Sequence, residues 1–133
     1  MPKWCNQGES LTGNVFLKNE AQVSKYLGLY SDADEPGEDA TLATITELAV
    51  ASNYARILLG NADWTESPQS VFTNLLKTFT AVGGSWTSPT GYFITDVASG
   101  TGGNLVSVET FSDGPYTVND GWSVKVTPKV TIA

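Results

Sequence analysis

The stretch that most restricts the fold of this chain runs from Gly91 to Phe111. Residues 92–97 alternate between two sets of mainly β-branched and aromatic side chains. Residues 105–111 alternate in the same way after a turn that holds three glycines. A period of two with such residues indicates strands packed on at least one face. Because glycine adopts positive φ without steric cost, the stretch predicts a β-hairpin.

The glycine-rich turn between residues 98 and 104 also raises the question of phosphate binding. A phosphate-binding loop needs a lysine after its glycines and a helix behind them. Here a strand pattern follows, and the loop contains no lysine. The residues therefore favour a plain hairpin connection over an anion cradle.

Further short strands are predicted on both sides of the hairpin, separated by Gly, Pro, Asn and Asp. This spacing is typical of an all-β fold, an antiparallel β-sandwich of jelly-roll or Greek-key type. The predicted strands are Tyr26–Tyr30, Tyr54–Leu59, one or two within Val71–Val82, Trp122–Val126 and Lys129–Ile132. In Thr41–Ser52 the apolar residues recur at helical spacing, but the threonine density and the neighbouring strands favour a strand there.

The chain of 133 residues is expected to form one domain, residues 26–133, preceded by an N-terminal segment. Residues 1–25 are polar and lack a sustained pattern, so we expect an extended arm or, equally, a loosely packed lead strand. The apolar side chains of this segment are the candidate partner-binding residues, namely Trp4, Val15, Phe16 and Leu17. A bulky aromatic near a polar terminus needs something to cover it.

The composition argues against several classes of chemistry. There is no histidine and one cysteine, Cys5, so an imidazole general base, a zinc site and a disulfide are not expected. The acids in predicted strands, Glu47, Asp96 and Glu109, are expected to face solvent. We therefore predict no enzymatic activity, no catalytic residues, no metal ligands and no cofactor. The acidic run at residues 32–39 does not fit an EF-hand register, and a looser calcium site there stays open.

Charge and hydropathy restrict the partners. The net charge is −7 and the seven basic residues are scattered, whereas nucleic-acid binding needs clustered Lys and Arg. We expect neither nucleic acid nor membrane as a partner, because no apolar run approaches the ~20 residues of a membrane-spanning helix. The N-terminus has no apolar run of a secretory signal, so assembly in a cytoplasm is expected.

The aromatic residues allow two interpretations. Four tryptophans and five tyrosines on a small β domain could form a sugar-stacking platform, as in carbohydrate-binding modules. Alternatively Trp64, Trp86 and Trp122, each beside a turn, close the ends of the core.

The order of several short motifs resembles a known family. The motifs are Tyr26–Tyr30, Tyr54–Leu59, Ala62–Trp64, Ala81–Trp86, Gly91–Asp96, Gly102–Leu105 and Thr117–Gly121. Together, over roughly residues 26–133, they resemble a family of small tailed-bacteriophage virion proteins, often labelled tail-fibre or structural proteins. Residues 1–25 are expected to depart from the helical start that is usual in this family, and residues 36–44 lengthen the loop before Tyr54.

The resemblance implies a β-sandwich that forms oligomers on a virion and has no catalytic residues. It leads us to expect a non-enzymatic capsid decoration (cement) protein, a homotrimer, whose partner is the major capsid protein or another virion protein. A tail or fibre-associated structural protein is the alternative within the family, and a carbohydrate-binding module is the alternative from another class.

Overall fold

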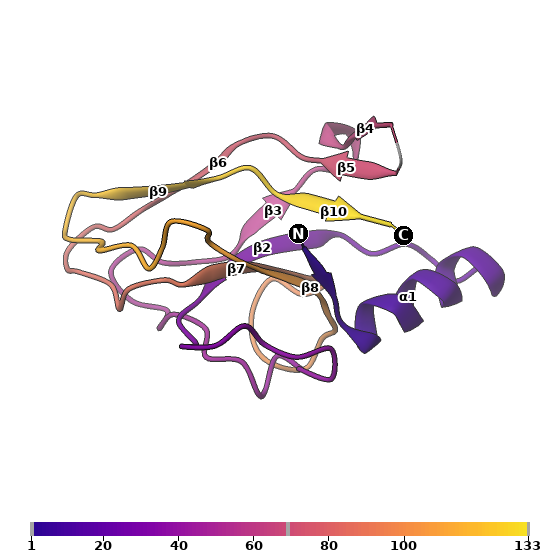
Figure 1. The fold of residues 1–133 in the computed structure, drawn as a ribbon, viewed down its shortest axis with the longest axis horizontal. Helices are drawn as coiled ribbons and strands as arrows, with labels where there is room; N and C mark the ends of the chain where they lie inside the picture. The colour runs from indigo at the N-terminus through magenta and orange to yellow at the C-terminus, as the bar shows by residue number, and fades with distance from the viewer. Residues whose placement is uncertain (1, 69, 133) are drawn as a thin grey trace.

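The computed structural model describes residues 2–68 and 70–132, and its strands pair in antiparallel sheets beside one α-helix (Figure 1). The mainly β fold predicted from the sequence is thus confirmed. The elements, in chain order, are β1 (Lys3–Trp4), α1 (Asn6–Leu17), β2 (Lys25–Tyr30), β3 (Ile57–Leu59), the 3-10 helix η1 (Asn61–Asp63), β4 (Thr65–Ser67), β5 (Val71–Thr73), β6 (Lys77–Thr80), β7 (Gly91–Thr95), β8 (Leu105–Thr110), β9 (Ser123–Val126) and β10 (Lys129–Thr131).

The largest sheet has the order β1-β8-β7-β2-β3 and is built around the predicted hairpin. Strands β7 and β8 pair directly, with a register shift at Ile94/Thr95, so the hairpin prediction is confirmed. Strand β2 lies on the other edge of β7 along its whole length. The close pairing depends on Gly91, because a Cβ there would lie 2.3 Å from the backbone oxygen of Glu109 and from the Tyr30 ring.

The remaining strands form two smaller sheets, β10-β5-β4 and β6-β9. Strands β5 and β6 follow each other along the chain, as do β9 and β10, and the Asn74 amide donates to the Pro128 carbonyl between the two pairs. Figure 1 shows these strands along one side of the molecule, with β2, β7 and β8 on the other. Their side chains Phe79, Val124 and Val130 belong to the same buried cluster as Leu27 and Leu29 of β2 and Ile94 of β7.

The opposite face of the five-stranded sheet is covered by the loop that joins β2 to β3. Here the strand predicted for Thr41–Ser52 is wrong, because these residues form turns and a single bridge between Glu47 and Tyr30. Strand β2 already pairs with β7 on one edge and with β3 on the other, which leaves little backbone for another strand. The apolar spacing instead buries Leu42 and Ile45 against Phe93. Strand β3 is likewise shorter than predicted, since residues 54–56 lie outside it.

The N-terminal residues form a short lead strand followed by a helix, rather than an extended arm. Strand β1 pairs with β8, and residues 6–17 form helix α1. The expectation that residues 1–25 lack a helical start is therefore wrong. Half of the residues of the helix are Asn, Gly, Ser and Thr, which are weak helix formers, and its first apolar side chain is Leu11, so the sequence signal is weak. Packing against β8 supplies much of the stabilisation that such a short helix needs.

Candidate functional site

An open apolar groove lies between α1 and the sheets, and we call it the α1 groove. Its volume is about 500 Å³, within the range of binding pockets. The lining residues come from α1, from β2 and the segment before it, from η1 and its neighbour Trp64, from β1, β5, β7 and β8, and from β10 and the residue after it. They include Trp4, Leu11, Val15, Phe16, Val23, Lys25, Trp64, Phe72, Ile94, Val106, Val130 and Ile132. An apolar hollow of this size on a small domain is a candidate binding surface.

The first half of α1 forms one wall of the groove and is packed tightly on β8. A Cβ on Gly8 would lie 2.2 Å from the Val106 carbonyl oxygen, so only glycine permits this approach. The Leu105 amide donates to Gln7 Oε1 at 2.9 Å, and the Cys5 amide donates to the Val106 carbonyl at 3.0 Å. Cys5 is buried, and this burial raises the pKa of its thiol to about 11. These contacts fix where α1 leaves the sheet.

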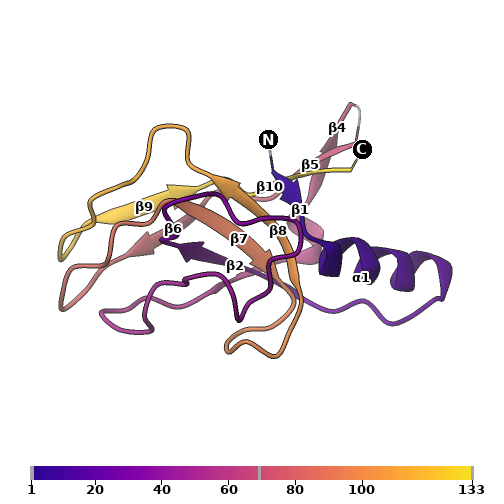
Figure 2. The same cartoon turned by 60° about the horizontal axis from the view of Figure 1, so that its bottom comes forward.

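The second half of α1 projects beyond the sheet, as Figure 2 shows. At its end Phe16 is 83% and Leu17 is 79% exposed. The helix ends there, and the Lys18 amide closes its last turn by donating to the Asn14 carbonyl. What distinguishes these side chains is the neighbouring groove, because they continue its apolar surface onto the projecting end of the helix.

Three of the four predicted partner-binding residues line the groove. Trp4, Val15 and Phe16 are among the lining residues, whereas Leu17 is not and lies on the exposed helix end. Trp4 is held by its indole Nε1, which donates to the Thr131 carbonyl at 2.6 Å. The structure therefore brings together side chains that the sequence placed in one segment.

Sequence reasoning missed the groove residues contributed by the domain. Trp64, Phe72 and Val130 come from three separate places in the chain. The sequence predicts Trp64 beside a turn and Val130 in a strand, but neither signal links them to α1. Only the order of strands in the sheets brings them together.

The electrostatics of the groove contrast with the acidic chain. Among the described residues that line it, Lys25 alone carries a charge. Its ammonium donates to the Val23 carbonyl at 2.6 Å. Burial lowers the pKa of Lys25, and the Asp96 carboxylate acts in the opposite direction. The groove therefore joins an apolar lining to one partly desolvated positive charge.

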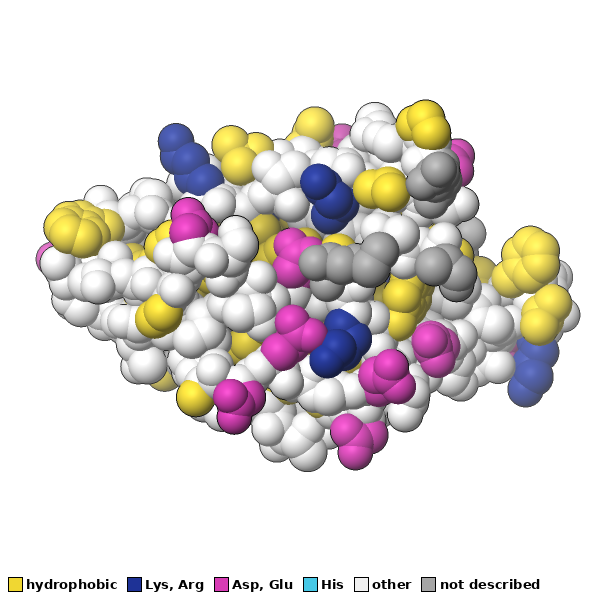
Figure 3. All heavy atoms as spheres, in the orientation of Figure 1, with side chains coloured by type: hydrophobic (Ala, Val, Ile, Leu, Met, Phe, Trp, Pro, Cys, Tyr) yellow, Lys and Arg dark blue, Asp and Glu magenta, His cyan; other side chains and the backbone are white. Residues whose placement is uncertain are grey.

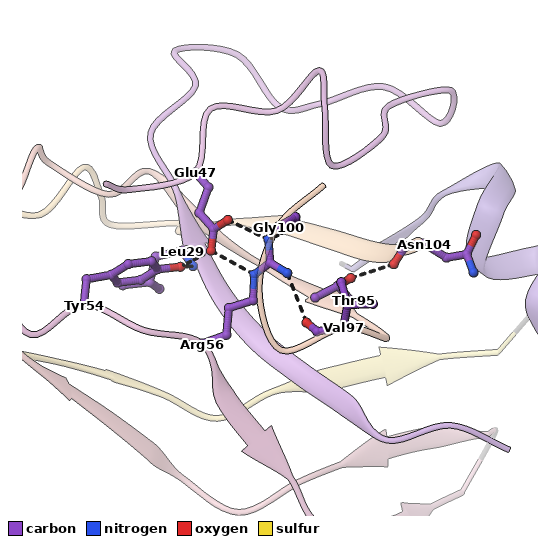
Figure 4. A network of polar contacts seen from close by, with 8 residues as sticks. All are labelled: Leu29, Glu47, Tyr54, Arg56, Thr95, Val97, Gly100 and Asn104. Carbon is purple, nitrogen blue, oxygen red and sulfur yellow. Dashed lines mark hydrogen bonds and ion pairs between the residues drawn. The ribbon is translucent and has the colours of Figure 1, made fainter. Parts of the chain in front are cut away.

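A second cluster, which we call the Arg56 cluster, lies beneath the glycine-rich turn (Figure 4). The Arg56 side chain is 2% exposed and binds Glu47 through two hydrogen bonds, Nε to Oε1 at 2.9 Å and Nη2 to Oε2 at 2.7 Å. The guanidinium also donates to the carbonyls of Val97 and Gly100 and lies 5.3 Å from the Phe93 ring centroid. Bidentate pairing of this kind is a strong charge-assisted contact.

The Arg56 cluster continues into the core through Tyr54. The Tyr54 hydroxyl donates to Glu47 Oε1 at 2.8 Å and accepts from the Leu29 amide at 2.9 Å. Burial raises the pKa of Tyr54 well above its usual range, and the Glu47 carboxylate adds to this effect. With three donors on its carboxylate, Glu47 is a structural ion-pair partner, and the expectation that it faces solvent is wrong.

The glycine-rich turn is held from within as well. Asp96 accepts from the backbone amide of Asn104 at 2.7 Å and from its side-chain amide at 2.8 Å. Thr95 Oγ1 donates to the Asn104 carbonyl at 2.7 Å, a contact drawn in Figure 4. Asp96 is therefore also engaged within the chain. Glu109 Oε1 accepts from the Tyr92 hydroxyl at 3.3 Å.

The tryptophans are dispersed. Trp4 and Trp64 line the α1 groove, whereas Trp86 packs edge-on against the Tyr54 ring and donates to the Ser52 carbonyl. Trp122 is 53% exposed near the far end of the molecule. Of the three turn-flanking tryptophans, Trp64 and Trp86 pack against the buried core, whereas Trp122 is largely exposed.

The acidic run at 32–39 makes contacts within the chain. Asp32 Oδ2 accepts from the Thr46 amide at 2.8 Å, and Glu35 forms an ion pair with Lys3 at 2.8 Å. The Lys3 ammonium lowers the pKa of Glu35. Within residues 2–68 and 70–132, no three His, Cys, Asp or Glu side chains gather closely enough to hold a metal ion.

Over the same described ranges, no helix has the length and apolar character needed to cross a membrane. Comparison with known proteins adds no relative: no family model matches the chain, and no curated protein matches it.

Proposed function

We propose that the protein is a non-enzymatic structural protein of a bacteriophage particle, a capsid decoration protein that stabilises contacts between shell subunits. The observation that supports this best is the projecting end of α1, where Phe16 and Leu17 are exposed beside the apolar α1 groove. Exposed aromatic and aliphatic side chains next to a hollow are typical of protein-binding surfaces.

The architecture suits such a role. We propose that the five-stranded sheet and the strands β5, β6, β9 and β10 form a rigid β-sandwich, with residues 1–25 as its attachment segment. The net charge of −7 keeps the rest of the surface from adhering to nucleic acid. On a particle with many copies, weak contacts by each attachment segment add through multivalency. The major capsid protein, or another virion protein, is the proposed partner during assembly in the host cytoplasm.

A tail or fibre-associated position is the alternative within this proposal. Quantitative mass spectrometry of purified virions separates the two, because a decoration protein is present in far more copies than a tail component. A copy number similar to that of the tail proteins would contradict the decoration role.

The attachment surface is best tested by point substitution. Deleting residues 1–20 would remove β1 and the whole of α1, including the part that packs on β8. We expect Phe16→Ser with Leu17→Ser to lower co-sedimentation with particles lacking the protein by at least about tenfold. Because both side chains are exposed, the free energy of unfolding should change by less than about 0.5 kcal/mol.

Leu75→Ser with Leu76→Ser is the matched control, since these leucines are 57% and 55% exposed between β5 and β6. The control variant should bind the particles as the wild type does. Undiminished binding by the Phe16 and Leu17 variant would refute the role of α1 in attachment.

A further inference from the structure

A second apolar surface lies on the three turns around residues 50–53, 81–84 and 119–122. It consists of Val50, Val82 and Trp122, which are 80%, 56% and 53% exposed, and we call it the loop-end patch. Backbone hydrogen bonds join the turns: Val82 donates to the Ser52 carbonyl, and Ala81 donates to the Trp122 carbonyl. The patch is therefore a fixed feature of the fold.

The loop-end patch and the α1 groove lie at opposite ends of the molecule. Figure 1 shows the turns that precede β9 and follow β6 at one end of the long axis and α1 at the other. Figure 3 shows hydrophobic side chains at both of these ends. Two apolar surfaces separated in this way cannot bind each other within one chain.

The charges of the two surfaces are complementary. Lys25 is the charged residue among the described lining of the groove. In the loop-end patch the carboxylate Asp120 lies two residues before Trp122, and its Oδ1 accepts from the Gly83 amide at 2.9 Å. An aromatic side chain with a nearby carboxylate thus faces outward at one end, and an apolar hollow with an ammonium group lies open at the other.

We infer that the loop-end patch of one copy binds in the α1 groove of the next, with Trp122 inserted among the apolar side chains and Asp120 directed toward Lys25. For a chain with net charge −7, contacts between copies that bring like charges together are unfavourable, whereas this pairing joins opposite charges. Such a head-to-tail contact closes into a ring or continues as a filament, depending on the rotation between copies.

The area requirement explains why more than one residue must take part. A buried tryptophan contributes about 150–250 Å², whereas a stable interface needs roughly 800 Å² from each partner. Val50, Val82 and the rims of both surfaces must therefore be covered as well. The expected contact is weak between isolated copies and becomes strong where a ring closes.

This inference concerns the purified chain alone and does not depend on a particle. Sedimentation velocity over a wide range of protein concentration tests it. The wild type should form species larger than a monomer. Trp122→Ser should weaken the association at least about tenfold, because a central aromatic side chain dominates such contacts. A monomeric wild type, or an unchanged mass for this variant, would overturn the inference.

The charge contact has its own test. Asp120→Asn keeps an oxygen that accepts from the Gly83 amide while removing the charge, and Lys25→Gln removes its partner. Each should weaken association several-fold, and the double variant should be little weaker than either single one, because the two residues act as a pair. Additive losses would contradict their pairing.

A mixing experiment distinguishes this contact from a symmetric dimer. A chain with Trp122→Ser retains its groove, and a chain with Lys25→Glu retains its loop-end patch. A mixture of the two should give a 1:1 dimer and nothing larger, since only one productive contact remains. Larger species in the mixture, or no association at all when both variants are folded by circular dichroism, would overturn the head-to-tail arrangement.

Discussion

The Arg56 cluster and the α1 groove are both formed by segments distant in the chain, yet they are opposite in character. In the Arg56 cluster a buried cation has partners for its guanidinium on Glu47, Val97 and Gly100. In the α1 groove, apolar side chains and a partly buried Lys25 face an open hollow.

The contrast separates stability from recognition. Polar groups that already have hydrogen-bond partners within the chain stabilise the fold and contribute little free energy to binding another molecule. Apolar surface left open lowers no free energy in the monomer and becomes favourable only when another molecule covers it. We therefore propose that the Arg56 cluster stabilises the fold and that the α1 groove binds a partner.

Substitution of Arg56 is the strongest way to test the first half of this comparison. Arg56→Met should lower the free energy of unfolding by about 3–5 kcal/mol, because Glu47 would keep a partly buried charge without its partner. Urea unfolding followed by fluorescence measures the loss. Arg56→Lys keeps the charge but not the bidentate geometry, so its free energy of unfolding should lie between those of the wild type and Arg56→Met. A loss below about 1 kcal/mol for Arg56→Met would show that the cluster is not a major source of stability.

Substitutions at two glycines compare the two halves of α1, because Gly8 lies in the half packed on β8 and Gly13 in the projecting half. Gly8→Ala places a Cβ against the Val106 backbone and should destabilise the fold by about 1–3 kcal/mol. Gly13→Ala is the matched control, since a Cβ there meets nothing within 4 Å. It should stabilise the protein by about 0.5–1 kcal/mol. Thermal unfolding of both variants gives the comparison, and equal effects of the same sign would contradict it.

Alkaline pH should have a smaller effect on the free energy of unfolding, through the buried cluster that contains Cys5 and Tyr30. Burial raises the pKa of Cys5 from 9.0 to about 11 and that of Tyr30 from 10.0 to about 12. Because the folded pKa values are the higher ones, the stabilisation is complete below about pH 9 and is lost as pH rises toward 11 to 12. The free energy of unfolding should therefore fall across this window.

The cysteine can be isolated from the other alkaline groups. Between pH 9 and 11 the decline should be shallower for Cys5→Ala than for the wild type, by on the order of 1–2 kcal/mol over the window. Identical pH profiles would show that the thiol does not contribute.

Local sequence patterns were sufficient for most strands of the large sheet. Strand β2 and the hairpin β7–β8 follow from alternation, since a side-chain period of two requires an extended backbone with two distinct faces. Alternation failed for residues 41–52, where Leu42 and Ile45 are buried by a loop. Burial there depends on the sheet beneath the loop, and a window of neighbouring residues does not contain that information.

The candidate sites depended more on tertiary structure. Trp4, Val15 and Phe16 could be selected as exposed apolar residues of a polar segment, and they do line the groove. The rest of the lining, such as Phe72 and Val130, is decided by strand pairing between β5 and β10. The partnership of Glu47 with Arg56 was also missed, because acids that alternate with apolar residues look the same whether they face solvent or a buried cation.

By itself, the sequence determined that this is a mainly β chain with a central hairpin and a negative net charge. Strand periodicity is a property of neighbouring residues, and net charge is a sum over the whole chain, so both can be read without the fold. Only the tertiary structure decided that residues 6–17 form a projecting helix, that Arg56 is buried beneath the glycine-rich turn, and that an apolar groove stays open. These features arise from contacts between residues far apart in the chain, whose free energy no local pattern records.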